Sequence, residues 1–289
     1  MSHEIELKLA LGTEGPEALR RHLLLAGLPP RAQRLGNTYF DTAQGDLEAA
    51  RMALRLRRID GRLLQTVKTR GEGGGGLSRR GEWEWEVPGP GLDLDGLAGL
   101  PPAALGQEVL EHLVPRFTTD FHRETREIDH AGARIEVALD EGEILAEGRR
   151  VPIRELELEL KTGDPEALWS LAETLAGSVP LRPADTSKAA RGGALLSGEW
   201  RLPGGDTPSA WLHRAVVALD ALADTGDGAW RQAARNALGE LGEASGDNDA
   251  GEAARGLAEA LSNPTWLSAT FGLTMVRLAR RLPADRPLG

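Results

Sequence analysis

The chain has 289 residues, of which 40% are hydrophobic and 27% charged, so it can bury a sizeable core and is neither intrinsically disordered nor fibrous. Its formal net charge of −10 excludes the broad basic surface of a non-specific nucleic-acid binder, so any anionic ligand must be held by a local basic cluster. The absence of cysteine excludes disulfides and thiolate metal sites.

The first ten residues carry Glu4, Glu6 and Lys8, where a signal peptide would need an unbroken apolar stretch. No segment approaches the roughly 20 consecutive apolar residues that span a bilayer. We therefore expect a cytoplasmic protein without a membrane partner.

The sequence pattern of the N-terminal part predicts mainly β-strands. Residues 5–11 alternate charged and apolar side chains, which indicates a strand, and a helix is expected from Gly15 to about Gly27, where Pro29 and Pro30 prevent its continuation. Alternation returns from Asn37. The predicted strands after this point are 38–41, 52–59, 63–69, 80–87, 117–129, 133–147 with an interior turn, and 153–160.

Two shorter features lie among and after these strands. Residues 71–76 are almost all glycine and predict a hairpin loop; a phosphate-binding loop is not favoured, because no GKS or GKT follows. Asp164, Pro165 and Glu166 supply the residues that begin a helix, and a second helix is expected over 186–196.

After Trp200 the composition changes to alanine-rich and leucine-rich segments with helical spacing, preceded by a linker at 203–208. We expect three or four helices over 209–282, with breaks near 225–228, 245–248 and 263–264. The domain boundaries predicted from this change are 1–200 and 209–289. No chemistry stands out in the second region, whose one histidine, His213, is expected to be solvated or in the core.

Charged side chains share one face of most predicted strands, since residues i, i+2 and i+4 of a strand point the same way. This pattern groups Glu4, Glu6 and Lys8; Arg55 and Arg57; Arg80, Glu82, Glu84 and Glu86; Arg134, Glu136 and Asp140; and Glu155, Glu157, Glu159 and Lys161. For any single strand, a solvated polar face is the simpler interpretation. The acids, however, concentrate on the first strand and on the last two, whereas the middle strands contribute basic residues. This segregation indicates a site.

The two kinds of charge suggest phosphoryl transfer. Neighbouring carboxylates repel unless a cation lies between them, and carboxylate clusters suit hard ions such as Mg²⁺ or Mn²⁺. Converging arginines and lysines suit a polyanion, whose phosphate oxygens a guanidinium group can bind in bidentate fashion. A closed barrel would give the charged face a lumen.

Several motifs, taken in order, resemble the CYTH family, also called the triphosphate tunnel metalloenzymes. The first is the ExExK signature of residues 4–8. Those that follow are Leu54-Arg55-Leu56-Arg57, Thr66-Val67-Lys68, Arg80 with Glu82, Phe121-His122-Arg123, Ile135-Glu136 with Leu139-Asp140, residues 155–159, and Ser187-Lys188-Ala189-Ala190-Arg191-Gly192. The resemblance covers about residues 1–200. It implies an α+β fold with an eight-stranded antiparallel β-barrel that forms a tunnel and has flanking helices, followed by a small all-helical C-terminal region.

The resemblance also implies roles for individual residues. Metal binding would fall to Glu4, Glu6, Asp140, Glu157 and Glu159, with Glu136 either a ligand or a neighbour of one; triphosphate binding would fall to Lys8, Arg55, Arg57, Lys68, Arg80, Arg123 and Lys188. Glu4, Glu6, Lys8 and Lys188 are the predicted catalytic residues. His3 and His122 are expected near these groups or on the surface. Some relatives append a histidine-rich helical domain called CHAD, but the tail here is shorter and no such role is transferred to it.

The leading functional hypothesis is hydrolysis of inorganic triphosphate to pyrophosphate and phosphate, with Mg²⁺ or Mn²⁺ as cofactor. Hydrolysis of thiamine triphosphate or a nucleoside triphosphate, and adenylate cyclisation, remain alternatives that need a pocket for an organic group. Trp83 and Trp85 lie on the apolar side of their strand, so no base-stacking platform is evident. A non-catalytic polyphosphate or nucleotide sensor is an alternative of another class. Nucleic acid is not an expected partner, and the protein is expected to be a monomer or homodimer.

Overall fold

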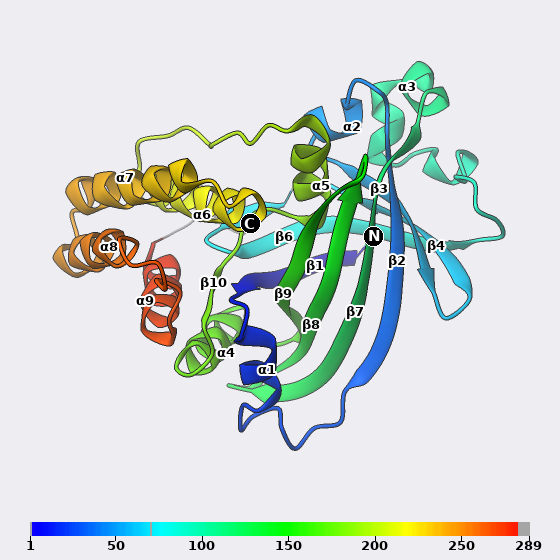
Figure 1. The fold of residues 1–289 in the computed structure, drawn as a ribbon. Coiled ribbons are helices and arrows are strands. Elements are labelled where there is room, and N and C mark those ends of the chain that lie inside the picture. Colours follow the sequence, from blue (N-terminus) through cyan, green and yellow to red (C-terminus); the bar gives the residue numbers. More distant parts are fainter. Residues whose placement is uncertain (1, 70, 283–289) are drawn as a thin grey trace.

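A computed structural model describes residues 2–69 and 71–282 of the chain. Eight antiparallel strands form a closed barrel in the order β1, β9, β8, β7, β2, β3, β4 and β6, with β1 and β6 paired to complete the ring (Figure 1). Their bounds are β1 Ser2–Leu11, β2 Arg31–Asp41, β3 Ala53–Ile59, β4 Arg62–Lys68, β6 Leu77–Val87, β7 Val114–His130, β8 Ala133–Ala146 and β9 Arg149–Thr162. The predicted fold class is confirmed.

Three predicted elements differ in detail. The α1 helix, Gly15–Arg20, ends well before Gly27, and β2 is longer than the segment 38–41. The interior turn predicted within 133–147 is wrong, because β8 continues through Gly142. A Cβ atom at Gly142 would lie 2.4 Å from the Cα of Phe121 on β7, so this glycine permits close packing of neighbouring strands and does not mark a turn.

The apolar faces of the barrel strands point outward and are covered by other elements. Leu7 and Leu9 of β1 and Leu156 and Leu158 of β9 are fully buried in the largest apolar cluster, which also contains residues of α4 (Glu166–Ala176) and of the C-terminal helices. On another side of the barrel, Trp83 and Trp85 are packed in a second apolar cluster, under the segment of short helices η1 Asp95–Leu97, η2 Pro101–Leu105 and α3 Gln107–Glu111. The charged faces are therefore left to line the barrel interior.

The C-terminal region forms α6 Pro208–Thr225, α7 Gly228–Ala244, α8 Asn248–Ala260 and α9 Ala269–Arg281. The breaks lie where the sequence predicts them, and Thr207, Asp227, Asp247 and Ser268 cap the helix N-termini with their side chains. These helices stack beside the barrel (Figure 1), and α9 packs against α4 and the short strand β10, Leu181–Pro183. Among the described residues, no helix combines the length and apolar character needed to cross a membrane.

Two further elements shape one end of the barrel. The glycine-rich segment folds back as predicted, with β5, Glu72–Gly74, paired to the start of β6. The α5 helix, Lys188–Ser197, begins where Ser187 accepts a hydrogen bond from the amide of Ala190, and it packs against β7, β8 and β9. This start places Lys188 in the first turn of α5, beside the barrel interior.

Candidate active site

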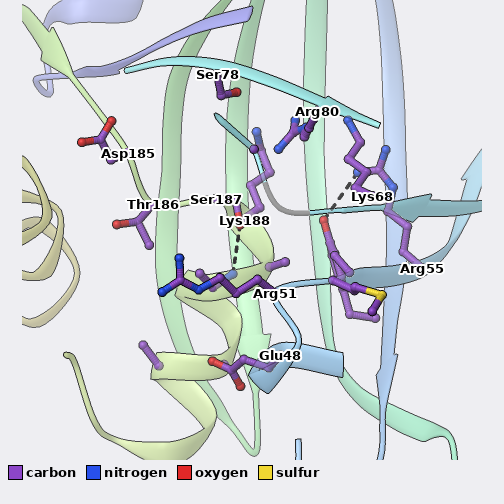
Figure 2. Close-up of a pocket in the computed structure, with 18 of the residues that line it drawn as sticks. Glu48, Arg51, Arg55, Lys68, Ser78, Arg80, Asp185, Thr186, Ser187 and Lys188 are labelled. Atoms are coloured by element: carbon purple, nitrogen blue, oxygen red, sulfur yellow. Dashed lines mark hydrogen bonds between the residues drawn. The ribbon is translucent and has the colours of Figure 1, made fainter. Parts of the chain in front are cut away.

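The barrel interior contains a cavity of about 1490 Å³. Figure 2 shows Arg55, Lys68, Arg80 and Lys188 among its lining side chains, contributed by strands β3, β4 and β6 and by helix α5. The predicted site residues that line the cavity are Glu4, Lys8, Arg55, Arg57, Lys68, Arg80, Arg123, Glu136, Glu157, Glu159 and Lys188. The remaining two, Glu6 and Asp140, lie behind this lining, in contact with basic residues that belong to it.

The N-terminal glutamates contact two basic residues from neighbouring strands. β1 pairs with β6 so that Glu4 lies opposite Arg80, whose guanidinium group lies 3.1 Å from Glu4 and 2.7 Å from Glu6. Lys68 bridges Glu4 at 2.9 Å and Glu82 at 3.0 Å. Burial acts to raise the pKa of Glu4, but Lys68 and Arg80 outweigh it and hold that pKa well below its usual range.

A second set of acids surrounds Lys188. Its ammonium group lies 2.8 Å from Asp140, 2.6 Å from Glu155 and 3.0 Å from Glu157. Arg123 makes two hydrogen bonds to Asp140, of 2.7 and 2.6 Å, and a third to Glu157. Burial opposes the charge of Lys188, but the carboxylates raise its pKa well above the usual range. Lys188 is therefore a fixed cation at neutral pH.

Three other cations in the cavity have no close carboxylate. Arg55 is 7% exposed, its nearest carboxylate is 4.0 Å away at Glu82, and its Nε has no hydrogen-bond partner. Arg57 lies 4.0 Å from Glu84, and its Nε donates a 3.0 Å hydrogen bond to Oδ1 of the neutral Asn37. Burial together with the charges of Arg55 and Arg123 lowers the pKa of Arg57 to about 10. Among the residues that the structure describes, Lys8 makes no ion pair within 4.0 Å, although it is 6% exposed. A buried cation without a close counter-charge is costly, which indicates that an anion belongs beside these groups.

Three acids on β8 and β9 could take part in holding a divalent cation. Burial raises the pKa of Glu159, and the nearby charges of Glu4 and Glu136 act in the same direction, while Lys161, 2.8 Å away, only partly offsets them. Glu157 is likewise within the cavity wall. Such carboxylates offer the hard oxygen ligands that Mg²⁺ and Mn²⁺ prefer, so the donor set fits a divalent ion. In contrast, the closest group of three acids, Asp140, Glu155 and Glu157, already surrounds the ammonium of Lys188.

Sequence reasoning placed Glu155 on the charged face but assigned it no role. The structure shows it 3% exposed, between Lys188 and Arg191 of α5. Burial acts to raise the pKa of Glu155, but these two cations outweigh it and lower the pKa to about 2. The signal in the sequence was that Arg191 follows Lys188 by three residues, so both side chains lie on one face of a helix.

The sequence analysis also did not predict that aromatic residues line the cavity. Tyr39 and Phe117 stack with ring centroids 4.7 Å apart, and both line the cavity together with Phe121. His122, by contrast, is exposed, as expected for a surface residue. His213 lies on the cavity rim and its Nδ1 is 2.6 Å from Asp185, whereas the side chain of His3 lies outside the described residues.

The structure is an enclosed antiparallel barrel whose inner face carries carboxylates and also cations without a close carboxylate. Such a barrel defines a class of protein that can hold an anion and a cation together. The family model for the CYTH domain matches residues 2–192, and the chain belongs to that family.

Two relatives illustrate the similarity. The inorganic triphosphatase of Haemophilus influenzae is 36% identical over 202 residues, which cover 68% of this chain and 56% of that protein. The chain therefore spans little more than half the length of that relative. A solved structure of a Hippeastrum protein, described as an adenylyl cyclase with a dominant triphosphatase activity, matches with a TM-score of 0.52 and 23% identity, over 68% of this chain and 97% of that one. This second likeness supports the fold alone.

Proposed function

We propose that this protein is a metal-dependent phosphohydrolase that converts inorganic triphosphate to pyrophosphate and phosphate inside its barrel. The observation that carries the proposal is the placement of Lys8, Arg55 and Arg57, cations without a close carboxylate, in the same cavity as Glu4 of β1. The similarity to the inorganic triphosphatase of Haemophilus influenzae supports the choice of substrate.

The proposed metal is Mg²⁺ or Mn²⁺, held by Glu4 and Glu6 of β1 with Glu136, Glu157 and Glu159 from the adjoining strands. When bound, such an ion would neutralise phosphate oxygens and favour attack by water. Asp140, also predicted as a ligand, is fully buried beneath Arg123 and Lys188, so it would reach a metal only after Lys188 leaves it. In the arrangement described, Asp140 holds those two cations in place.

The basic residues would position the substrate and stabilise the charge that builds up on it. Arg55 and Arg57 can each present a planar guanidinium fork to phosphate oxygens, and Lys8 and Lys188 can add point charges along the chain of phosphates. Lys68, Arg80 and Arg123 would complete this set. Because phosphoryl transfer passes through a loose transition state that needs little covalent help from the protein, positioning and electrostatic stabilisation account for most of the rate gain, and no covalent intermediate is required. A cavity carboxylate would orient the attacking water and accept its proton.

Hydrolysis of an organic triphosphate is the second candidate. It is favoured by the stacked pair of Tyr39 and Phe117 and by Phe121, which give the cavity an apolar part that inorganic triphosphate does not need. Aromatic faces of this kind can support a heterocyclic ring. The aromatic residues thus make thiamine triphosphate and nucleoside triphosphates worth testing beside tripolyphosphate.

The test is a phosphate-release assay with tripolyphosphate, pyrophosphate, ATP and thiamine triphosphate, each with Mg²⁺, Mn²⁺ or EDTA. We expect the fastest release from tripolyphosphate, none in EDTA, and loss of turnover in Glu6→Gln and in Lys8→Ala with the fold retained. Glu86→Gln on β6 is the matched control, since its side chain is 59% exposed and lies outside the cavity. Wild-type turnover in either site variant would mean that the site is misassigned, and binding without any turnover would favour a sensor.

A further inference from the structure

Helix α6 presents two buried acids to the end of the barrel that carries Lys188. Asp220 and Asp224 lie one helical turn apart, so they share a face of α6, and each side chain is 4% exposed. The residues around Asp220, such as Val217 and Leu219, are apolar and buried. Both acids lie beyond residues 2–192, which the family model matches. Neither belongs to the cavity lining described above.

Asp224 begins a chain of alternating charges that ends in the cavity. Its carboxylate accepts two hydrogen bonds from Arg191, of 2.9 and 2.6 Å, and Arg191 also donates to the carbonyl of Pro152 at 2.6 Å. The same guanidinium group contacts Glu155, whose other oxygen lies 2.6 Å from the ammonium of Lys188. Arg191 is therefore shared between an acid of α6 and the acid that holds Lys188.

Asp220 fixes the backbone just before Lys188. Its Oδ2 accepts hydrogen bonds from the amides of Asp185 at 3.2 Å and Thr186 at 3.0 Å, three and two residues before the lysine. Its Oδ1 accepts a 2.6 Å hydrogen bond from Arg182 of β10. Because these partners are all buried or half-buried, the segment that leads into α5 is held by an acid of the C-terminal region.

We propose that Asp220 and Asp224 are positioning residues for Lys188, so that helix α6 is part of the machinery that holds the phosphate-binding lysine in place. The inference rests on the proposed function, in which Lys188 contacts the triphosphate. If the charge of Asp224 is removed, Glu155 is the one carboxylate left within 4.0 Å of Arg191 among the described residues, and Arg191 draws it away from Lys188. The lysine, on its flexible four-carbon stem, then loses one of its three fixed partners and binds the anion less well.

The test is isothermal titration calorimetry with tripolyphosphate in EDTA, so that binding is measured without turnover. We expect Asp224→Asn to weaken binding by about ten-fold, the range typical of residues that support a binding group. Asp224→Glu, which keeps the charge, should stay within about two-fold of wild type. The matched control is Asp249→Asn, since Asp249 also pairs with an arginine, Arg281, but on exposed α8.

A double-mutant cycle separates positioning from a general structural defect. In a Lys188→Ala background, Asp224→Asn should change the dissociation constant by less than about two-fold, because the residue through which it acts is gone. Equal weakening in both backgrounds, or wild-type or tighter binding by Asp224→Asn, would overturn the inference while the proposed function stands. No binding by the wild-type protein in EDTA, together with no phosphate release in Mg²⁺ or Mn²⁺, would overturn both. If thermal unfolding shows that Asp224→Asn does not fold, Asp220→Asn is measured in the same cycle with the same expectations.

Discussion

The basic residues of the cavity form two sets that differ in what they contact. Lys188 and Arg123 each touch two or three carboxylates at hydrogen-bonding distance. Arg55 and Arg57 lie on the opposite arc of the barrel, on β3, and no carboxylate in the described part of the chain is closer to them than 4.0 Å. One set is held by acids of the protein itself, and in the proposed function the other is neutralised by the substrate.

This difference predicts opposite consequences for stability. Removing one member of a buried ion pair leaves an uncompensated charge and is strongly destabilising. Removing a buried cation that lacks a partner relieves a desolvation cost, although it harms binding, which is the trade-off often found at functional sites. Substitutions in the two sets should therefore separate effects on folding from effects on activity.

The largest effect is expected for Arg123→Gln, in the paired set. Its loss leaves Lys188 as the remaining cation both for the fully buried Asp140 and for Glu157. We expect the free energy of unfolding to fall by about 4 kcal/mol, and kcat/KM for tripolyphosphate to fall by roughly 100-fold. Urea unfolding and steady-state kinetics measure the two quantities. A variant with wild-type stability would show that the ion pairs around Asp140 do not hold the fold.

The sequence was sufficient to predict which residues face the barrel interior, because the period of a strand is two. Alternation alone grouped Glu4 with Lys8 and Arg55 with Arg57, and the structure places these side chains in one cavity. Alternation does not specify which distant strands pair, so the contact between β1 and β6 that brings Arg80 to Glu6 could not be deduced from it.

The contacts that helices α5 and α6 make with the site could not be predicted from the sequence, for a different reason. The role of Glu155 depends on Arg191 from α5, and that of Arg191 depends on Asp224 from α6, so three elements must be placed before any one residue acquires a function. One local signal was present: Asp220 stands in an apolar run of α6, and a buried acid in such a run requires a partner. The sequence does not say that this partner is Arg182.

The second largest effect is the pH dependence of the free energy of unfolding that Glu155 causes. The pKa of Glu155 is lowered from 4.5 to about 2 in the folded protein. The unfolded chain therefore binds more protons than the folded one between these values. The stabilisation, roughly 3 kcal/mol, is complete above pH 4.5 and is lost as the pH falls toward 2. Glu155→Gln has no carboxylate to titrate at this position, so it should lose this contribution to the pH dependence of stability. The difference in the free energy of unfolding between wild type and variant should therefore shrink as the pH falls from 4.5 toward 2. Urea unfolding of both proteins at several pH values measures it, and a constant deficit would contradict the assignment.

The smallest effect on stability, and the sharpest contrast with Arg123, is expected for Arg57→Gln. Burial and the charges of Arg55 and Arg123 disfavour the Arg57 cation, and its one close hydrogen-bond partner among the described residues is the neutral amide oxygen of Asn37 at 3.0 Å. Because this single hydrogen bond offsets only part of that cost, removing the cation should raise the free energy of unfolding by about 0.5 kcal/mol. The loss of one cation beside the substrate should lower kcat/KM for tripolyphosphate by roughly ten-fold. Calorimetric melting and steady-state kinetics give the two values.

Arg34→Gln is the matched control for this last comparison. Arg34 also lies on a barrel strand and pairs with Asp120 at 2.7 Å, but its side chain is 69% exposed and it is outside the cavity. Its substitution should change stability by less than about 0.5 kcal/mol and leave activity unaltered, as is usual for an exposed ion pair. If Arg57→Gln instead lost several kcal/mol, as expected for Arg123→Gln, the contacts of Arg57 with Asn37 and Glu84 would have to stabilise the fold as strongly as a close ion pair. The basic residues could then not be divided into a set that stabilises the barrel, Lys188 and Arg123, and a set that binds an anionic ligand, Arg55 and Arg57.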